Sequence, residues 1–303
     1  MGSALSEHPF LIIAGQPKAG TTSIHNWLAH HPDVCESSVK ETRFFLDETY
    51  PVPSGKRFDG LNGHEYLSFF PERDGLKTLL ESTPDYLYAQ SALAISNLAP
   101  KARVVFVVRD PVERAVSWYK YAAQTGRLGK HISFDDYIRR QLYKKVTDQT
   151  PIHYRALDQN RIRRYLPAFQ KRFGSRCLVL DFGDMKKDPY RFVSQICEFA
   201  GLDSRFYEGF DFRPKNVSTG RRASRSSRIY YRSRALFSYY VRPSENVRRY
   251  LRPLARLIKS VLSRSSFLGE IEVTEELAAA IRDDARSGCV VSNEGKRPAG
   301  RRK

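Results

Sequence analysis

The stretch Pro9-Phe-Leu-Ile-Ile-Ala-Gly-Gln-Pro-Lys-Ala-Gly-Thr-Thr-Ser23 decides the fold of this 303-residue chain. Its first part is a continuously apolar run that stops at Gly15, which is typical of a strand buried on both faces of a parallel sheet. Residues 21–30 follow with apolar side chains at helical spacing, and Pro32 stands just beyond them. The chain is therefore predicted to open with a strand, a polar loop and a helix.

The same alternation continues along the chain. Short apolar runs predict further strands, and longer periodic segments predict helices that follow them. The expected strands are 77–81, 103–109 and 177–181, and the expected helices are 111–121, 160–173 and 189–200. Alternating strands and helices imply right-handed crossovers. The predicted fold class is thus α/β, with a P-loop-like doubly wound parallel sheet flanked by helices.

Charge divides the chain unevenly. The formal net charge is +18, and residues 213–264 contribute +14 of it, with fifteen Lys or Arg against the single acid Glu245. Basic character therefore belongs to one late segment and not to the fold as a whole. We predict a catalytic domain over 1–225, a basic, partly helical C-terminal extension over 226–291, and a disordered polar tail over 292–303.

The cysteines and the first residues bear on the compartment. Cys35, Cys177, Cys197 and Cys289 lie far apart without zinc-type spacing, so we expect free thiols and no metal site. Residues 1–10 have no basic region followed by an apolar run, and no segment approaches the roughly 20 apolar residues that span a bilayer. We expect a cytoplasmic protein, either free or resting on an anionic membrane.

The loop after the first strand predicts an anion site. Backbone N–H groups and the positive end of the helix dipole meet there. The nucleotide triphosphate loop has the pattern Gly-x-x-x-x-Gly-Lys-Ser/Thr; Gly15 and Gly20 have its spacing, but Thr21 stands where its lysine belongs. The lysine is instead Lys18, inside the loop. A P-loop-type nucleotide kinase is therefore disfavoured, and it stays as an alternative.

A second motif is Val104-Val-Phe-Val-Val-Arg-Asp-Pro-Val-Glu-Arg-Ala-Val-Ser-Trp-Tyr119. Together the two motifs resemble those of sulfotransferases that use 3'-phosphoadenosine 5'-phosphosulfate (PAPS), closest to the heparan sulfate and glycan branch. The resemblance implies that Arg109 and Ser117 bind the 3'-phosphate, and that the loop binds the 5'-phosphosulfate through Lys18, Ala19, Gly20, Thr21, Thr22 and Ser23. Arg109 ends a strand at the carboxyl edge of the sheet, where ligands bind in such folds.

Further matches extend the resemblance over about residues 9–225. Lys40-Glu-Thr-Arg-Phe-Phe45 resembles the segment that supplies the catalytic carboxylate, which implies that Glu41 is the general base. Tyr66-Leu-Ser-Phe-Phe-Pro71 and Glu81-Ser-Thr-Pro-Asp-Tyr86 are similar to segments that follow it. Ser218-Thr-Gly-Arg-Arg222 resembles the loop over the 3'-phosphate, which implies roles for Gly220 and Arg221.

Two departures from the family concern the acceptor. Ser82 stands where several heparan-type members carry a lysine, and Arg43 where some carry a histidine. The candidate acceptor contacts each have a structural alternative. Lys40 either holds the acceptor or pairs with Glu41, Glu81 either contacts the acceptor or supports local structure, and Tyr154 either lines the acceptor groove or caps a helix. Arg43 completes this set.

The implied reaction is an in-line transfer of the sulfuryl group of PAPS to a hydroxyl or amine, with adenosine 3',5'-bisphosphate as product and no metal. Lys18 and the loop N–H groups would neutralise charge on the leaving phosphate. Glu41 would take the acceptor proton. Phe44 and Phe45 are expected to bury Glu41 and raise its basicity.

The late basic segment leaves alternatives open. It either steers an anionic glycan or membrane or forms a solvated face. An apolar stripe over residues 247–262 favours packing on the domain over lying on lipid. A nucleic-acid-binding protein remains a further hypothesis, because tyrosines stand among the arginines at 230, 231, 239 and 240; we expect no specific nucleic-acid partner. The acceptor, a glycan, glycolipid or small molecule, and the oligomeric state are left open.

Overall fold

The computed structural model describes residues 4–70, 77–129, 131–215, 221–223, 265–268 and 270–287, without the side chains of 221–223 and 265–267. Several features named above lie outside these ranges. They are Gly220, Cys289, the tyrosines between 230 and 240, the stripe 247–262 and the tail 292–303.

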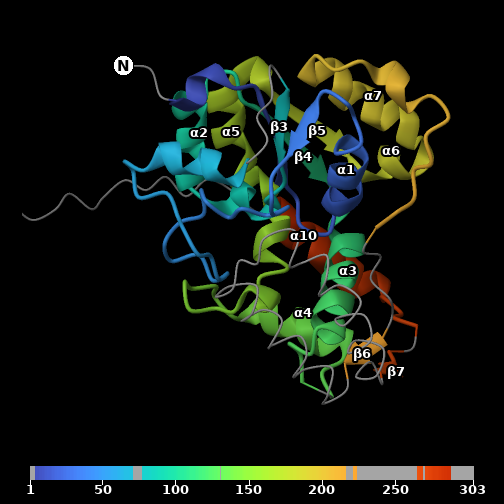
Figure 1. Ribbon diagram of the computed structural model, residues 1–303. Coiled ribbons are helices and arrows are strands. Elements are labelled where there is room, and N and C mark those ends of the chain that lie inside the picture. The colour runs from blue at the N-terminus through green and yellow to red at the C-terminus, as the bar shows by residue number, and fades with distance from the viewer. Residues whose placement is uncertain are drawn as a thin grey trace, which may run out of the picture.

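Five strands form one parallel sheet (Figure 1). They are β1 (Phe10–Gly15), β2 (Val34–Glu36), β3 (Thr78–Glu81), β4 (Arg103–Val108) and β5 (Cys177–Asp181), in the spatial order β2-β3-β1-β4-β5. The predicted doubly wound α/β sheet is thereby confirmed. β2 was not predicted, because three residues are too few to show a strand period.

The side chains of β1 enter two separate cores. Phe10, Ile12 and Ala14 belong to one apolar cluster, and Leu11 and Ile13 to the other. All five are at most 1% exposed. Burial of a large apolar side chain stabilises a fold by about 1.5–3 kcal/mol, so this central strand is a principal anchor of the domain. The continuous apolar run in the sequence reflects this burial on both faces.

Helices cover both faces of the sheet. On one side lie α1 (Thr21–Leu28), α6 (Phe182–Lys187) and α7 (Pro189–Ala200), and on the other lie α2 (Ile95–Leu98) and α5 (Leu166–Phe173) (Figure 1). α7 is followed by Gly201 in the left-handed conformation, with φ 75°, which is typical of a helix end. Short 3-10 turns connect these elements: Ala4–Glu7, Gly63–Phe69, Pro84–Tyr88, Ser91–Ala94, Ile152–Tyr154, Asp158–Asn160, Ile162–Arg164, Gly174–Arg176 and Ser204–Tyr207.

The helix predicted over 160–173 is regular only in its second half. Two 3-10 turns precede α5, which begins at Leu166 with Pro167 in its first turn. Proline has no N–H to donate and clashes with the preceding turn, so it is tolerated only where a helix starts. This single residue explains why the helical pattern does not run through from residue 160.

A group of helices lies beyond the carboxyl ends of the strands. α3 (Pro111–Gln124), α4 (Phe134–Tyr143) and α10 (Glu275–Arg286) form it, with β6 (Arg221–Ala223) and β7 (Ser265–Phe267) nearby (Figure 1). α10 packs on α3 and α4, and its Ile281 is fully buried. Arg161 Nη2 lies 2.5 Å from Asp284 Oδ1. One helix of the C-terminal extension therefore packs on the main domain.

The topology locates the crevice for a ligand. β1 stands between β3 and β4, and the chain winds outward from it in both directions. Open α/β sheets bind ligands outside the carboxyl ends of the strands at such a switch point. The loop that follows β1 starts at this point, with α3 beyond it.

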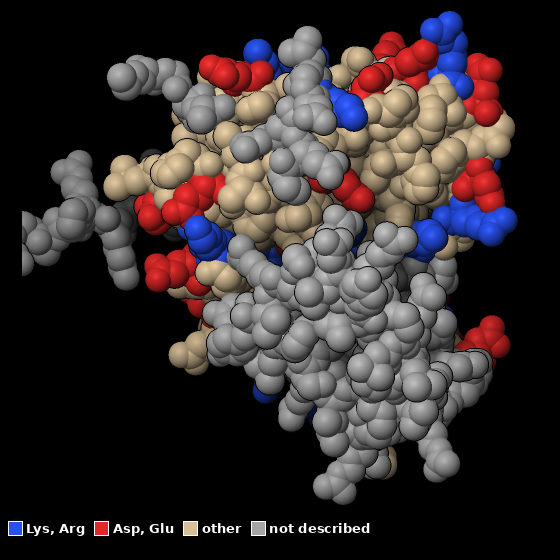
Figure 2. All heavy atoms as spheres, in the orientation of Figure 1, with Lys and Arg blue, Asp and Glu red and all other residues tan. Residues whose placement is uncertain are grey.

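Acidic and basic side chains are interspersed over the described part of the face that Figure 2 shows. Most of the basic segment 213–264 lies outside the described ranges.

None of the helices in the described part of the chain combines the length and the apolar character that crossing a bilayer requires. Cys35, Cys177 and Cys197 are free thiols, as expected.

Candidate active site

The loop between β1 and α1 is held in one tight conformation. Gln16 N donates to Val107 O at 2.9 Å, and Ala19 N donates to Gln16 O at 3.1 Å. Lys18 and Gly20 both have positive φ, of 72° and 77°. A Cβ on Gly20 would lie 2.6 Å from Met185 Cε and 2.9 Å from Phe182 Cε2, so these side chains would have to shift to admit one. The first N–H groups of a helix have no helical carbonyl partner, so those of Thr21 and Thr22 can bind an anion, whereas Ser23 N already donates to Gly20 O at 2.9 Å.

Lys18 lies at the centre of this loop. Its Nζ lies 4.4 Å from the centre of the Tyr121 ring, a cation–π contact with α3. Burial, together with the positive charges of Arg109 and Arg114, lowers the pKa of Lys18 to about 8. A lysine held among cations is stabilised by a bound anion. The arrangement fits a phosphosulfate group.

Arg109 meets Lys18 directly. Its Nη1 donates to Lys18 O at 3.0 Å, and its guanidinium lies 4.5 Å from the centre of the Phe182 ring. Its Nε and Nη2 donate to Glu113 Oε2 at 3.2 and 3.1 Å. The two motifs, some ninety residues apart in the sequence, thus converge on one place.

The other residues expected at the 3'-phosphate lie along α3. Ser117 is half-buried on this helix. β6 contacts α3, which brings the backbone of Arg221 near the same helix. Gly220 and the side chain of Arg221 lie outside the described residues. The 3'-phosphate roles of Ser117, Gly220 and Arg221 therefore stay predictions. The structure brings the segments of Arg109, Ser117 and Arg221 close to one another.

Two of the loop residues expected to bind the donor, Ala19 and Ser23, form hydrogen bonds within the protein. The Ala19 amide closes the loop onto Gln16, and the Ala19 side chain is fully buried. The Ser23 hydroxyl accepts a hydrogen bond from Lys215 N at 2.9 Å. The donor-binding roles of Ala19 and Ser23 stay predictions, with these two groups engaged inside the protein. Thr21 and Thr22 lie in the first turn of α1, where their predicted roles need them.

Arg114 and Gln16 support the loop and were not singled out from the sequence. Arg114 is fully buried; its Nε donates to Asn160 Oδ1 at 2.6 Å, its Nη1 to Pro17 O at 3.3 Å, and its Nη2 to Ala156 O. All three partners are neutral, and burial lowers its pKa. The signal for Arg114 was present as the second arginine of the motif that contains Arg109.

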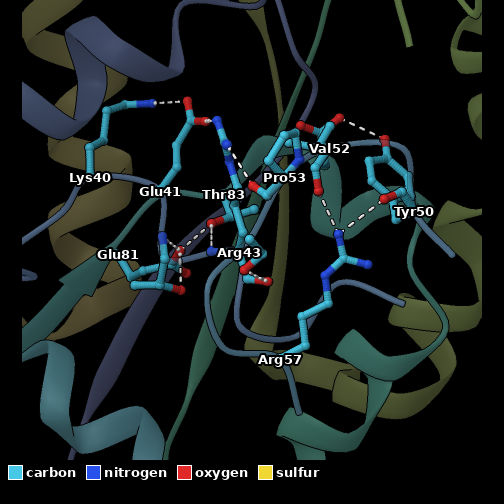
Figure 3. A network of polar contacts seen from close by, with 12 residues as sticks. Lys40, Glu41, Arg43, Tyr50, Val52, Pro53, Arg57, Glu81 and Thr83 are labelled. Atoms are coloured by element: carbon cyan, nitrogen blue, oxygen red, sulfur yellow. Dashed lines mark hydrogen bonds and ion pairs between the residues drawn. The ribbon is translucent and has the colours of Figure 1, made fainter. Parts of the chain in front are cut away.

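Glu41 is held between two cations on the other side of β1 (Figure 3). Lys40 Nζ lies 3.2 Å from its Oε1, and Arg43 Nη2 lies 3.0 Å from its Oε2. Burial acts to raise the pKa of Glu41, but the charges of Lys40 and Arg43 together outweigh it and hold the pKa below its usual value. The lowered pKa keeps the carboxylate ionised. Because its side chain is one-third exposed, a ligand can reach it.

Phe44 and Phe45 do not have the role expected for them. Both are fully buried in an aromatic cluster with Tyr66, with ring centres 5.6 and 4.9 Å from it. They fix the segment in the core. The expectation that they raise the basicity of Glu41 was wrong, since the neighbouring cations determine its pKa.

Glu81 holds the segment that contains Glu41 in place through hydrogen bonds. It is fully buried and accepts hydrogen bonds from Thr42 N at 3.2 Å, Thr42 Oγ1 at 3.1 Å and Tyr66 Oη at 3.2 Å, and from the Thr83 hydroxyl. Burial raises its pKa to about 7. Of the two roles expected for Glu81, the structure favours the support of the segment over contact with the acceptor.

The remaining candidates are placed as follows. Ser82 is fully buried, and its Oγ lies 2.9 Å from His25 Nδ1, while His25 Nε2 lies 2.9 Å from Glu36 Oε2. Tyr154 packs its ring beside Tyr137, with centres 5.9 Å apart. Within the described ranges, no three His, Cys, Asp or Glu side chains converge as metal ligands would.

Comparison with known proteins agrees with this geometry. The model of the sulfotransferase family matches residues 9–206. The chain is 24% identical over 229 residues to bifunctional heparan sulfate N-deacetylase/N-sulfotransferase 4 of Mus musculus, covering 68% of this chain and 24% of that protein. It is 26% identical over 214 residues to bifunctional heparan sulfate N-deacetylase/N-sulfotransferase 2 of Homo sapiens, covering 64% of this chain and 22% of that protein.

A solved structure shares the fold. The crystal structure of a sulfotransferase from Alicyclobacillus acidocaldarius aligns with a TM-score of 0.50 and 20% identity, covering 91% of this chain and 98% of that chain. The chain spans about a quarter of the length of the curated relatives named above. The family match covers more than half of the chain, including β1, its loop and the Arg109 motif, and on this ground the chain belongs to the sulfotransferase family.

Proposed function

We propose that this protein transfers the sulfuryl group of PAPS to a hydroxyl or amine of a carbohydrate or glycolipid-like acceptor. The observation that carries the proposal is the contact between Arg109 Nη1 and Lys18 O at 3.0 Å. It brings the side chain expected at the 3'-phosphate to the loop expected at the 5'-phosphosulfate. A nucleotide with phosphate at both ends would be held by both.

The charges near the loop support a dianionic ligand. Lys18, Arg109 and Arg114 are close enough for the two arginines to lower the pKa of the lysine. Arg114 has only neutral hydrogen-bond partners. The electrostatic cost of holding these cations together is relieved when phosphate or sulfate oxygens bind among them. We assign Lys18, Gly20, Thr21, Thr22, Arg109 and Ser117 to the donor site.

The chemical step needs one base and one charge-stabilising group. The acceptor oxygen or nitrogen forms a bond to sulfur while the bond from sulfur to the 5'-phosphate oxygen breaks. Lys18 and the loop N–H groups face the charge that grows on the leaving phosphate, an electrostatic contribution of about 3–4 kcal/mol for one well-placed donor in comparable sites. Glu41 accepts the proton that the acceptor loses.

Glu41 is suited to this task by its charge state. The low pKa that Lys40 and Arg43 impose keeps it ionised at neutral pH. To take a proton it must exchange one of these ion pairs for the acceptor group. Lys40 and Arg43 therefore lie beside the entering acceptor, in agreement with the substrate-binding roles proposed for them.

Other parts of the proposal rest on residues outside the described ranges. Peripheral contact with an anionic membrane and steering of an anionic glycan depend on the sequence of the late basic segment, whereas the proposed cytoplasmic location rests on the cysteines and on residues 1–10. A carbohydrate acceptor is suggested by the relatives, whose names include heparan sulfate. The kinase alternative is not favoured, because Thr21 opens α1 where the kinase lysine would stand.

Calorimetric titration with adenosine 3',5'-bisphosphate tests the donor site. We expect micromolar binding by the wild type and at least tenfold weaker binding by Lys18→Ala and by Arg109→Ala. Lys171→Ala, on the exposed side of α5, serves as the control. Adenosine 5'-phosphate, which lacks the 3'-phosphate, should bind wild type and Arg109→Ala alike. Equal binding of the bisphosphate by all four proteins would reject the assignment.

A further inference from the structure

A polar cavity lies beside the reaction centre. Its volume is about 90 Å³, enough for a polar group of a few heavy atoms. Its lining includes Asp47, Tyr50, Tyr88, Asp148 and Gln159. None of these residues was singled out from the sequence.

The cavity lies between the donor loop and the Glu41 segment. Gln159 O accepts hydrogen bonds from Gln16 Nε2 of the donor loop at 2.8 Å and from Tyr88 Oη at 2.9 Å. Tyr50 Oη donates to Asp85 Oδ1 at 2.7 Å, and the charges of Glu41 and Arg43 act on the pKa of Asp85. One wall therefore connects to the sulfuryl donor and the other to the proposed base.

Gln159, one of the lining residues, carries an unused hydrogen-bond acceptor. Its side chain is 1% exposed, and its Nε2 donates to Tyr50 Oη at 3.1 Å. Its Oε1 has no hydrogen-bond partner among the described residues. A buried amide oxygen without a donor is destabilising, so a ligand that donates a hydrogen bond here binds more tightly.

The charges around the cavity favour a particular class of ligand. Three carboxylates, those of Asp47, Asp148 and Asp158, line it together with the guanidinium of Arg155. Asp158 Oδ1 lies 3.9 Å from Arg161 and 3.7 Å from Arg164, which offset its charge. Asp47 and Asp148 against Arg155 leave the lining with a net negative charge, which repels a carboxylate or sulfate.

We propose that this cavity binds the acceptor through a hydroxyl or ammonium group that donates to Gln159 Oε1, and that it selects uncharged or positively charged acceptors over anionic ones. The inference rests on the proposed function and names the chemical class of its acceptor. It differs from what the basic segment of the sequence suggested, since the cavity beside Glu41 has the opposite charge.

Three monosaccharides of equal ring size test the proposal. We use methyl glucoside, which is neutral, glucosamine, which is cationic, and glucuronate, which is anionic. Their binding to protein saturated with adenosine 3',5'-bisphosphate is measured by saturation-transfer NMR titration. We expect methyl glucoside and glucosamine to bind and glucuronate to bind at least tenfold more weakly. Equal binding of glucuronate, or no binding of any of the three, would overturn the charge selection.

Variants test the role of Gln159. Gln159→Leu should weaken methyl glucoside and glucosamine at least fivefold, while Gln90→Leu, an exposed glutamine outside the lining, should leave both unchanged. Asp148→Asn should reduce the preference for glucosamine over glucuronate by about two- to fivefold. Full sugar binding by Gln159→Leu would refute the assignment of Oε1.

Two readouts separate this inference from the proposed function. Bisphosphate binding by Gln159→Leu reports that the variant is folded, because the backbone contact to Gln16 does not depend on the side chain. Should that variant fail to fold, Gln159→Glu keeps an oxygen at the site and should favour glucosamine over methyl glucoside more than the wild type does; an unchanged ratio would overturn the inference. Loss of bisphosphate binding by the wild type would instead reject the donor site.

Discussion

The two sides of β1 differ in charge and in how they are built. On the side of β4, Lys18, Arg109 and Arg114 surround a loop held by backbone hydrogen bonds. On the side of β3, Glu41 is paired with Lys40 and Arg43, while Glu81 and Asp85 accept hydrogen bonds from Thr42, Tyr66 and Tyr50. The donor side is cationic and rigid, whereas the acceptor side is mostly acidic. A negatively charged donor and a proton-donating acceptor can thus be kept apart until they meet above β1.

The largest effect is expected from neutralising Glu41, the proposed base on the acidic side. Glu41→Gln should lower kcat by about 10²- to 10⁴-fold, the usual contribution of a general base. Binding of adenosine 3',5'-bisphosphate should not change, because Glu41 lies on the opposite side of β1 from Lys18. Steady-state kinetics and calorimetry measure the two quantities. Glu41→Asp keeps a carboxylate and should recover part of the rate; a loss below tenfold in Glu41→Gln would contradict its role as base.

The rigidity of the cationic side is tested at Gly20. Gly20→Ala should lower the free energy of unfolding by about 2–4 kcal/mol, since it combines a positive φ with a contact at Met185. Gly201 is a matched control, because its φ of 75° is nearly the same and no atom lies within 4 Å of its Cβ position. Gly201→Ala should cost only about 1 kcal/mol. Urea denaturation measures both, and equal costs would show that the loop is not tightly packed.

The acidic side should make stability depend on pH through Glu81. Its pKa is raised to about 7 from 4.5, so the folded state retains a proton that the unfolded state loses. The stabilisation is complete below pH 4.5 and is lost as the pH rises through 7. The free energy of unfolding should fall by about 1–3 kcal/mol over this interval. Glu81→Gln, which does not ionise, should flatten the dependence, as measured by denaturation at several pH values; an unchanged slope would assign it to other groups.

The smallest effect is a change in the pH profile of donor binding. With a pKa of about 8, Lys18 should lose its charge above pH 8, and bisphosphate affinity should fall several-fold between pH 8 and 10. The phosphates are already ionised there, with a second pKa near 6. Lys18→Arg keeps its charge at these pH values and should remove this decline in a calorimetric series. A wild-type affinity that is constant to pH 10 would mean that Lys18 does not contact the anion.

The donor side could be predicted from local patterns, and the acceptor side only in part. The run 9–14 and the glycines after it indicated a buried strand and an anion loop, and parallel strands then bring Arg109 to the same edge as Lys18. The three residues of β2 were too few to recognise. The pKa of Glu41 was predicted with the wrong sign, because burial does raise it but the ion pairs with Lys40 and Arg43, which form only in the folded chain, outweigh burial.

The amino-acid sequence alone determined the parallel α/β sheet, the loop at Lys18 and the paired Arg109 motif. These features follow from the spacing of apolar residues, from the backbone conformations that glycine allows and from the direction of the strands. Each of these acts over a few residues. Tertiary structure decided the charge states of Lys18 and Glu81, the support of the loop by Arg114, and the cavity at Gln159. Gln16 and Gln159 lie 143 residues apart and meet only in the folded chain. Burial and Coulomb interactions depend on distances in space, which local sequence patterns do not contain.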